Sequence, residues 1–371
     1  MNKTAENKQE NFPEKLTKIL NYGALNLGMG IGYRMGLFDI MDSLETPQPV
    51  SVISKRANLN ERYVLEWLGI MVTGGIVDLI KDQKGQDLFQ LPKAHADLIT
   101  RRAGNENMGV YTQEIPLLTA TVFEAVESGF RTGDGIPYGM YPGFYRFMTE
   151  LADAKHRQVL VNTFLPSVEN GGVVKKLKEG ISVCDVGCGE GVALVVMAEA
   201  FPKSRFLGID ISHDVIEKAT STAKEKGLQN ISFQQQDASA LEKARKLCGL
   251  FDYVTAFDAI HDQTQPMEAL LGIHAILKDG GVFSMVDIAA SSDLGKNMDH
   301  PMGMFLYTVS LMHCMPVGLA EGGMGLGMMW GREKAVSMLK EAGFAEVSVE
   351  EIPEDPFNLH FFCTKRGKNA D

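Results

Sequence analysis

Three glycines directly after an apolar run constrain this chain more than any other feature. Residues 181–186 carry the β-branched side chains of a strand, and Gly187, Gly189 and Gly191 follow within five residues. The next segment, residues 192–200, is apolar and suits a helix. Glycines let the backbone turn sharply and approach a ligand, and a helix N-terminus offers free N–H groups. The pattern therefore predicts a nucleotide-binding turn between a strand and a helix.

The spacing of these glycines argues against a dinucleotide site. Such sites place glycines as G-x-G-x-x-G, and here the third position is Val192, while Gly191 comes one residue early. A nicotinamide-dependent dehydrogenase is therefore disfavoured.

Four successive apolar runs each end near a carboxylate. The runs are residues 181–186, 206–210, 231–236 and 251–257, and the carboxylates are Asp185, Asp210, Asp237 and Asp258. Open α/β sheets bind their ligands at the carboxyl ends of the strands, so we expect these four side chains to gather at one edge.

Taken together, these motifs resemble the class I S-adenosylmethionine-dependent methyltransferases. The similarity rests on residues 183–191, 208–210, 236–238 and 251–262, and keeps their order over most of the second half of the chain. It implies an α/β fold, a Rossmann-like seven-stranded methyltransferase sheet that closes with an antiparallel hairpin. It also implies S-adenosyl-L-methionine as the cofactor.

The resemblance gives the motifs separate roles in binding that cofactor. Asp185 and the turn would hold the methionine end, Asp210 the ribose hydroxyls, and Asp237 the adenine amine. A carboxylate accepts two hydroxyl hydrogen bonds well, and acidic residues suit a cationic sulfonium. The full expected set is Asp185, Gly187, Cys188, Gly189, Gly191, Asp210, Ile211, Asp237, Ala238, Phe257 and Asp258.

A histidine directly after the fourth strand is the candidate catalytic base. His261 and Asp262 resemble the His-Asp pair of plant-type small-molecule O-methyltransferases, although Gln263 stands where those enzymes carry Trp. We expect a hydroxyl acceptor, and activity that rises with pH through about 6.5, the ordinary histidine pKa.

Three alternatives stay open. His261 is a structural residue bonded to Asp262 or to backbone, the acceptor is an amine that needs no base, or the fold only binds the cofactor as a scaffold.

Two irregular segments offer candidates for binding the acceptor. Residues 133–143 form a Gly/Pro/Tyr loop, and residues 289–331 lack regular patterning but are rich in methionine, which adapts to irregular apolar ligands. The candidates are Tyr138, Tyr141, Tyr307 and Trp330. The alternative is that these side chains only pack the loop or a dimer interface.

The first part of the chain has a winged-helix pattern. Helices are expected over residues 13–35, 50–57 and 60–73, and a hairpin over residues 76–91. DNA recognition needs clustered cations, whereas the third of these helices offers Arg62 beside Glu61 and the net charge is −11, so nucleic acid is excluded as a partner. In the O-methyltransferases that this arrangement resembles, such a domain forms a homodimer, and the repeated glycines of the first helix suggest a closely packed backbone.

The expected organisation has four parts. Residues 1–12 are a disordered tail, 13–104 a winged-helix-like dimerisation domain, 105–164 a helical linker that lines the acceptor site, and 165–371 the catalytic domain.

Composition sets the remaining expectations. An odd count of five cysteines indicates no disulfide framework and a reducing, cytoplasmic location. No apolar stretch is expected to reach the roughly 20 residues of a membrane span. No metal site is expected, although Asp258, Asp262 and Asp287 are carboxylates that a divalent ion could use.

Overall fold

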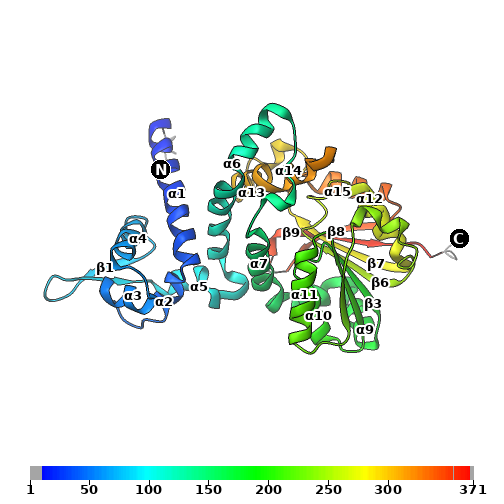
Figure 1. Ribbon diagram of the computed structural model, residues 1–371, viewed down its shortest axis with the longest axis horizontal. Coiled ribbons are helices and arrows are strands. Elements are labelled where there is room, and N and C mark those ends of the chain that lie inside the picture. Colours follow the sequence, from blue (N-terminus) through cyan, green and yellow to red (C-terminus); the bar gives the residue numbers. More distant parts are fainter. Residues whose placement is uncertain (1–10, 354, 368–371) are drawn as a thin grey trace, which may run out of the picture. The chain divides into compact units, whose positions relative to one another are not determined.

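A computed structural model describes residues 11–353 and 355–367 of the chain. The chain forms two compact units, Met1–Pro116 and Leu117–Asp371. Each unit is described by itself below (Figure 1).

The first unit is a small helical domain with one antiparallel hairpin. Asp78 pairs with Gln90 and Lys81 with Asp87 in this hairpin. Its elements are α1 (Phe12–Arg34), α2 (Leu37–Asp42), α3 (Val50–Ala57), α4 (Glu61–Thr73), β1 (Asp78–Lys81), β2 (Asp87–Gln90) and α5 (Lys93–Ile99). The order of helix, helix and hairpin confirms the winged-helix pattern.

Residues 11 and 12, the last two of the expected disordered tail, belong to the start of α1. Asn11 caps α1 by accepting a hydrogen bond from the Glu14 backbone N–H at 3.0 Å, and Phe12 begins the helix. A side-chain cap satisfies one of the free N–H groups at a helix start. Residues 1–10, the rest of the expected tail, lie outside the described residues.

The glycines of α1 are explained by neighbours within the same unit. Trp67 donates its indole N–H to the Gly28 carbonyl at 2.9 Å. A Cβ added at Gly32 would lie 2.5 Å from the Trp67 ring, and one at Gly30 would lie 2.5 Å from the Thr112 carbonyl oxygen. The close backbone approach expected for this helix is therefore internal.

The second unit contains a seven-stranded sheet in the order β5-β4-β3-β6-β7-β9-β8. Neighbouring strands from β5 to β7 are parallel, whereas β9 runs antiparallel to both β7 and β8. The strands are β3 (Ser182–Val186), β4 (Arg205–Asp210), β5 (Ile231–Gln235), β6 (Phe251–Phe257), β7 (Leu277–Ile288), β8 (Glu346–Ile352) and β9 (Asp355–Thr364).

The strand order reverses between β3 and β6. From β3 the chain continues to β4 and β5 on one side, whereas β6 leads to β7 on the other. Ligands of open α/β sheets bind at such a switch point, outside the carboxyl ends of the strands. The crevice next to residues 187–191 and 258–262 is therefore the place to look for a site.

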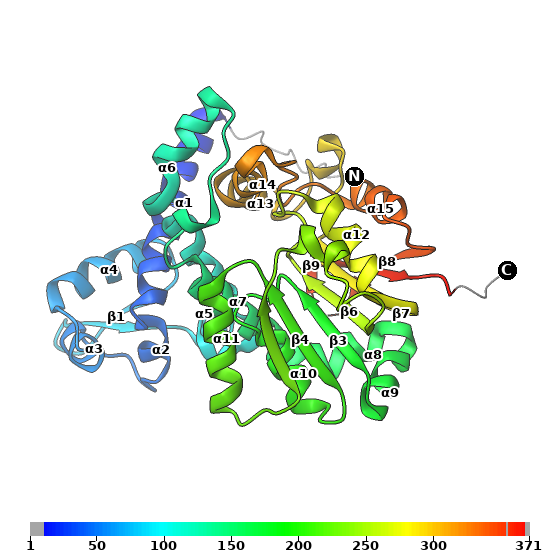
Figure 2. The same ribbon diagram turned by 45° about the vertical axis from the view of Figure 1, so that its right-hand side comes forward.

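Helices cover both faces of the sheet. One face packs against α9 (Gly172–Glu179) and α10 (Val192–Ala200), and the other against α12 (Pro266–Ile276) and α15 (Arg332–Glu341). The helix α7 (Phe144–Val159) contacts α10. Figure 2 shows α12 and α15 beside the sheet, and α11 (His213–Glu225) adjoins β4 and β5.

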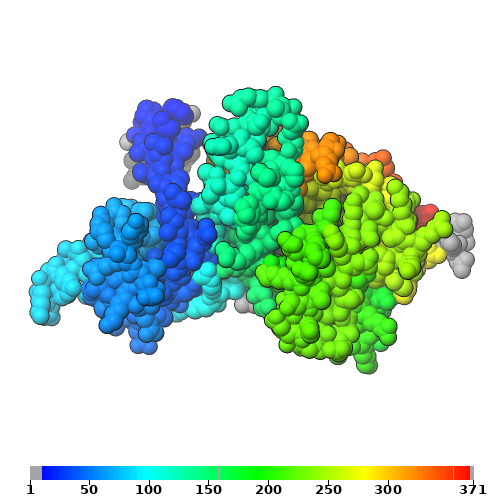
Figure 3. Space-filling view, viewed as in Figure 1, coloured from blue at the N-terminus to red at the C-terminus, as the bar shows by residue number. Residues whose placement is uncertain are grey.

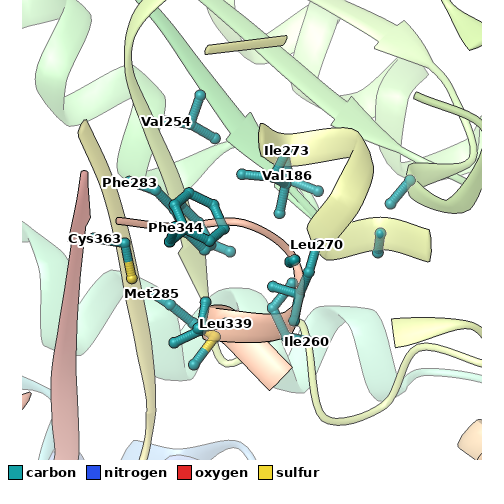
Figure 4. Close-up of a cluster of buried hydrophobic side chains, with 14 of the residues drawn as sticks. Val186, Val254, Ile260, Leu270, Ile273, Phe283, Met285, Leu339, Phe344 and Cys363 are labelled. Atoms are coloured by element: carbon teal, nitrogen blue, oxygen red, sulfur yellow. The ribbon is translucent and has the colours of Figure 1, made fainter. Parts of the chain in front are cut away.

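The core on the α12 and α15 face is fully desolvated. Val186, Val254 and Phe283 come from three strands, and Ile273 and Leu339 from the two helices (Figure 4). All five side chains are completely buried. Burial of such side chains contributes roughly 1.5–3 kcal/mol each, and it fixes the strand ends that carry the site.

The segment from 289 to 331, expected to be irregular, contains a continuous helical run. It comprises α13 (Gly303–Val309), a π-helical turn (Ser310–Cys314) and α14 (Met315–Leu319). A helix that is apolar on every side shows no amphipathic period, which explains the missed prediction.

The same run also corrects the expectation about apolar length. Residues Gly303–Gly322 are long and apolar enough to cross a membrane, with a mean hydropathy of 1.3, but 61% of the window is buried inside the protein. This burial is what a core helix of the unit requires.

Candidate functional site

The glycine turn after β3 leaves an open surface at its centre. Gly187, Gly189 and Gly191 have φ of 74°, 51° and 77°, which favour glycine. A Cβ at Gly187 would lie 2.6 Å from the Ala259 Cβ, and one at Gly191 would lie 2.5 Å from the Phe233 ring. At Gly189 no atom lies within 4 Å of the added Cβ. A ligand therefore has access to the backbone at Gly189.

Asp210 ties the end of β4 to this turn. Its Oδ2 accepts the Gly189 backbone N–H at 3.0 Å, and its Oδ1 accepts the Ser212 N–H at 2.9 Å. An ionised carboxylate has about four acceptor positions, so Asp210 keeps acceptor capacity for a ligand hydroxyl. Burial raises the pKa of Asp210, while the backbone N–H groups act against the rise. The next side chain, Ile211, is 61% exposed.

Asp185 is buried near the end of β3, just before the glycine turn. It pairs in register with Thr255 of β6, whose hydroxyl donates to its Oδ1 at 2.7 Å. Burial raises the pKa of Asp185 to about 7, and the nearby Asp210 adds to the shift. Two mostly buried carboxylates that influence each other favour a cationic ligand, which would lower both pKa values.

The adenine-side candidates lie at the start of a short 3-10 helix, Ala238–Lys243. Asp237 caps this helix by accepting hydrogen bonds from the backbone N–H and hydroxyl of Ser239, each at 2.8 Å. The Asp237 side chain is exposed, whereas Ala238 is buried. The cap fixes the direction of the Asp237 carboxylate at the end of β5.

Phe257 and Asp258 contact α7. The Phe257 ring lies edge-on to His156, with 4.8 Å between centroids. The Asp258 carboxylate lies 3.6 Å from the Lys155 ammonium, which also lies 3.4 Å from Asp355. Asp258 has a φ of 50°, a strained value for a non-glycine residue. These two candidates are therefore engaged by protein side chains.

His261 forms a buried ion pair with Asp287. The His261 Nδ1 lies 2.8 Å from the Asp287 Oδ1, and the two residues are 2% and 0% exposed. The partner is therefore Asp287 and not Asp262, the partner considered from the sequence. Asp287 ends the strand after β6, so its position as a fifth strand-end carboxylate was the signal that could have identified it.

The environment of His261 corrects the expected pKa. Burial acts to lower the pKa of the imidazole, but the Asp287 carboxylate and the Cys314 side chain together outweigh burial and hold the pKa well above 6.5. The Cys314 thiol is a further hydrogen-bond partner of the ring. The neighbouring Asp262 is half-buried, and burial raises its pKa to about 7.

The four candidates for the acceptor site lie in different environments. Tyr138 stacks on Tyr145 at 4.8 Å, and the Tyr141 hydroxyl donates to the Met312 carbonyl at 3.0 Å. The Tyr307 hydroxyl accepts a hydrogen bond from the Asn297 amide at 3.0 Å.

Trp330 has a different environment from the one expected. It lies in the core and donates its indole N–H to the Asp287 Oδ1 at 3.0 Å. Tyr138 and Tyr141 thus lie in contact with each other. Trp330 instead contacts Asp287 from the core.

Within the described ranges 11–353 and 355–367, no group of three or more His, Cys, Asp or Glu side chains could hold a metal ion. The three carboxylates Asp258, Asp262 and Asp287 therefore form no such group.

Sequence comparison identifies both units. Residues 177–354 match a methyltransferase domain, and residues 23–101 match an Rv2258c-like winged helix-turn-helix domain. An uncharacterized methyltransferase of Bacillus subtilis is 31% identical over 111 residues, 30% of this chain and 42% of that protein. A ubiquinone biosynthesis O-methyltransferase of Methylococcus capsulatus is 31% identical over 102 residues, 28% of this chain and 41% of that protein. The match thus spans less than half the length of these curated relatives.

A solved structure shares the fold along almost the whole chain. Human N-acetylserotonin methyltransferase, in complex with S-adenosylmethionine, aligns with a TM-score of 0.69 and 15% identity. The alignment covers 97% of this chain and 99% of the human chain. Residues 177–354 therefore form a methyltransferase domain, residues 23–101 form a winged helix-turn-helix domain ahead of it, and the chain has the fold of an S-adenosylmethionine-dependent methyltransferase.

Proposed function

We propose that this protein transfers the methyl group of S-adenosylmethionine to a hydroxyl oxygen of a small molecule, with His261 as general base. The observation that carries the proposal is the buried pair of His261 and Asp287 at 2.8 Å, at the carboxyl ends of β6 and β7. Relatives named as O-methyltransferases of small molecules support the choice of acceptor.

The strand ends at the switch point carry residues that suit the cofactor. Gly189 is open to a ligand, Asp210 retains acceptor positions for ribose hydroxyls, and Asp237 lies at the end of the next strand. Asp185 adds negative charge below the turn. The bound cofactor would supply an electrophilic methyl group on a positively charged sulfur.

His261 would take the proton of the acceptor hydroxyl. Asp287 holds Nδ1, so Nε2 would take the proton, in place of the hydrogen bond between the ring and the Cys314 thiol. The Asp287 charge stabilises the imidazolium that forms, and burial of both residues excludes water. General base catalysis of this kind contributes about 10²- to 10⁴-fold in rate.

A second candidate is methyl transfer to an amine. The Asp262 carboxyl is half-buried beside His261, and burial raises its pKa to about 7. A carboxyl with that pKa is suited to accept a proton from an ammonium group near neutral pH. In that case His261 would be dispensable.

We further propose a cytoplasmic homodimer that does not bind nucleic acid. All five cysteines are free thiols, as a reducing compartment favours. Large apolar side chains stand exposed along α1, which is deep blue in Figure 3: Phe12, Leu16, Ile19, Leu20 and Tyr22. An exposed apolar stripe of this kind suits a two-fold interface.

The test combines cofactor binding with a search for the acceptor. Calorimetry should detect S-adenosylmethionine binding, and a metabolite extract should show products heavier by one methyl group. His261→Ala should bind the cofactor as tightly as wild type and lose about 10²- to 10⁴-fold in turnover. Binding without any product would instead favour a scaffold, and full activity of His261→Ala would favour the amine.

A further inference from the structure

A lysine of α7 lies between two carboxylates at the carboxyl edge of the sheet. The Lys155 ammonium lies 3.6 Å from Asp258 Oδ2 and 3.4 Å from Asp355 Oδ2. The two aspartates stand directly after β6 and at the start of β9, and all three side chains are mostly buried. Both distances exceed those of an ordinary N–H···O hydrogen bond, roughly 2.7–3.2 Å. Neither ion pair is therefore closed by a tight hydrogen bond.

Asp258 carries two signs of a functional residue. Its Oδ1 is buried and has no hydrogen-bond partner within residues 11–353 and 355–367. A buried polar atom without a partner costs roughly 1–3 kcal/mol, so native structures seldom keep one without a reason. The φ of Asp258, 50°, is also strained, and such strain is concentrated at ligand sites. Asp258 Oδ1 is therefore an acceptor that suits a donor of a bound ligand.

Asp258 lies next to the glycine turn. Its neighbour Ala259 packs against the first glycine, because a Cβ added at Gly187 would lie 2.6 Å from the Ala259 Cβ. The turn follows β3 and Asp258 follows β6, and these two strands are parallel neighbours at the switch point of the sheet. Lys155 and Asp258 are thus adjacent to the turn that is expected to hold the methionine end of the cofactor.

The methionine end of S-adenosylmethionine carries two opposite charges, an α-ammonium and an α-carboxylate. The charged members of the expected cofactor set are all acidic: Asp185, Asp210, Asp237 and Asp258. Carboxylates suit the ammonium and the sulfonium, but they repel the α-carboxylate, and this repulsion grows where water is excluded. Binding of the α-carboxylate therefore favours a cation beside the acidic groups, and Lys155 lies beside Asp258.

Lys218 is a competing cation near the turn. It lies on α11, and its ammonium is 2.6 Å from Glu190, the residue between the second and third glycines. That distance is a full charge-assisted hydrogen bond, and the Lys218 side chain is 54% exposed, against 21% for Lys155. Exposed charges are screened by water and salt, so the less exposed and more loosely paired Lys155 is the stronger candidate.

We propose that Lys155 binds the α-carboxylate of S-adenosylmethionine and that Asp258 Oδ1 accepts a hydrogen bond from its α-ammonium. This inference rests on the proposed function and adds a residue of α7 to the cofactor site. An ammonium has three donors, so Lys155 can bind the carboxylate without leaving Asp355. The alternative is that Lys155 only ties α7 to the sheet.

Ligands that differ by one charged group test the role of Lys155. Calorimetric titration would compare S-adenosylhomocysteine with decarboxylated S-adenosylhomocysteine. Wild type should bind the intact ligand about 10- to 100-fold tighter, the value of a hydrogen bond between charged groups. Lys155→Met should remove this preference. Its affinity for methylthioadenosine, which lacks the whole amino-acid end, should equal that of wild type.

A second analogue tests Asp258. Deaminated S-adenosylhomocysteine keeps the carboxylate and lacks the ammonium, so wild type should bind it about 10- to 100-fold more weakly than the intact ligand. Asp258→Asn should reduce this difference and retain the preference for the carboxylate. The two variants therefore lose different preferences, which a general loosening of the site would not produce.

Matched variants complete the design. Lys155→Arg keeps the cation and should retain the carboxylate preference, whereas the neutral Lys155→Gln should lose it and serves if the methionine variant does not fold. Lys176→Met is the control, because Lys176 of α9 also pairs with a carboxylate, that of Glu169 at 3.0 Å. This control and Lys218→Met should both bind as wild type.

The outcomes separate the two levels of the proposal. If the carboxylate preference is absent from wild type or survives in Lys155→Met, Lys155 only ties α7 to the sheet, and the inference is overturned while cofactor binding stands. Loss of the preference in Lys218→Met alone would give the role to Lys218 and also overturn it. If S-adenosylhomocysteine does not bind wild type at all, the proposed function fails first.

Discussion

Trp330 donates its indole N–H to Asp287 Oδ1, the same oxygen that is hydrogen-bonded to His261 Nδ1. The Trp330 Nε1 lies 3.0 Å and the His261 Nδ1 lies 2.8 Å from this Oδ1, and the Ile288 backbone N–H is a third donor at 2.8 Å. Asp287 Oδ2 is buried and has no hydrogen-bond partner among the described residues. One carboxylate oxygen therefore holds the orientation of the imidazole.

Removal of the indole donor should shift the pKa of His261. In Trp330→Phe the Asp287 anion loses one of its three donors, becomes more basic and binds the imidazolium more strongly. We expect the pH profile of kcat/KM to move to higher pH, which a purely structural residue would not cause. Trp67→Phe is the matched control, since Trp67 donates to a backbone carbonyl in the first unit. Equal pH profiles for Trp330→Phe and wild type would contradict this positioning role.

The ionisation of His261 should set the pH dependence of activity. Because Asp287 raises its pKa, the base is protonated at neutral pH, and turnover should rise with pH through a value above 6.5. His261→Gln should remove that limb of the profile. The raised pKa of His261 also stabilises the folded state. This stabilisation is complete below the pKa of the unfolded chain, about 6.5, and is lost as pH rises through the pKa of the folded state. A wild-type limb centred at or below 6.5 would contradict the ion pair as described.

Asp185 should destabilise the cofactor-free protein as pH rises. Its pKa is about 7 in the folded state, raised by burial, against roughly 3.9 unfolded, so its penalty is absent below about pH 4 and complete above about pH 7. Asp185→Asn should therefore melt higher than wild type, by a margin that grows over this range. The measurement is Tm from pH 4 to 8 without cofactor. A margin that shrinks with pH would show that burial does not dominate at this carboxylate.

Asp210→Ala should weaken S-adenosylmethionine binding by about 1.5–3 kcal/mol, the range for hydrogen bonds to a charged group. The fold should survive because Asp210 lies at the end of β4. It also anchors the Gly189 N–H, so part of the loss would come from a looser glycine turn. Calorimetric titration gives the affinity, with Asp279→Ala, an exposed aspartate on β7, as control. Unchanged affinity would remove Asp210 from the site.

The exposed face of α1 should mediate dimerisation. Leu20 is 67% exposed, and Leu20→Glu places a charge on the apolar stripe, so monomers are expected in light scattering at micromolar concentration. Leu294→Glu is a control at equal exposure in the second unit. Deletion of residues 1–35 is a harsher test, since it also exposes Trp67, and should yield monomers or aggregates. A wild-type protein that is already monomeric would refute the dimer.

The sequence by itself determined the local parts of the site. Left-handed backbone at Gly187, Gly189 and Gly191 follows from residue type, because glycine lacks the Cβ that forbids this conformation. The carboxylates at the ends of the parallel strands could be read from the alternation of apolar runs and polar ends. The winged-helix order followed from the same patterns, whereas the seven-stranded sheet was implied by the resemblance to the class I methyltransferases.

Only the tertiary structure decided which side chains meet. Parallel pairing of Phe257 with Val286 brings residue 261 beside Asp287, and the register between two strands is not encoded in either strand alone. Trp330 reaches Asp287 from a segment 43 residues further along, and the buried run 303–322 carried no periodic signal. The pKa values of His261 and Asp185 also depend on burial and on partners brought from distant segments, so the chemistry of the site became definable only once the chain was folded.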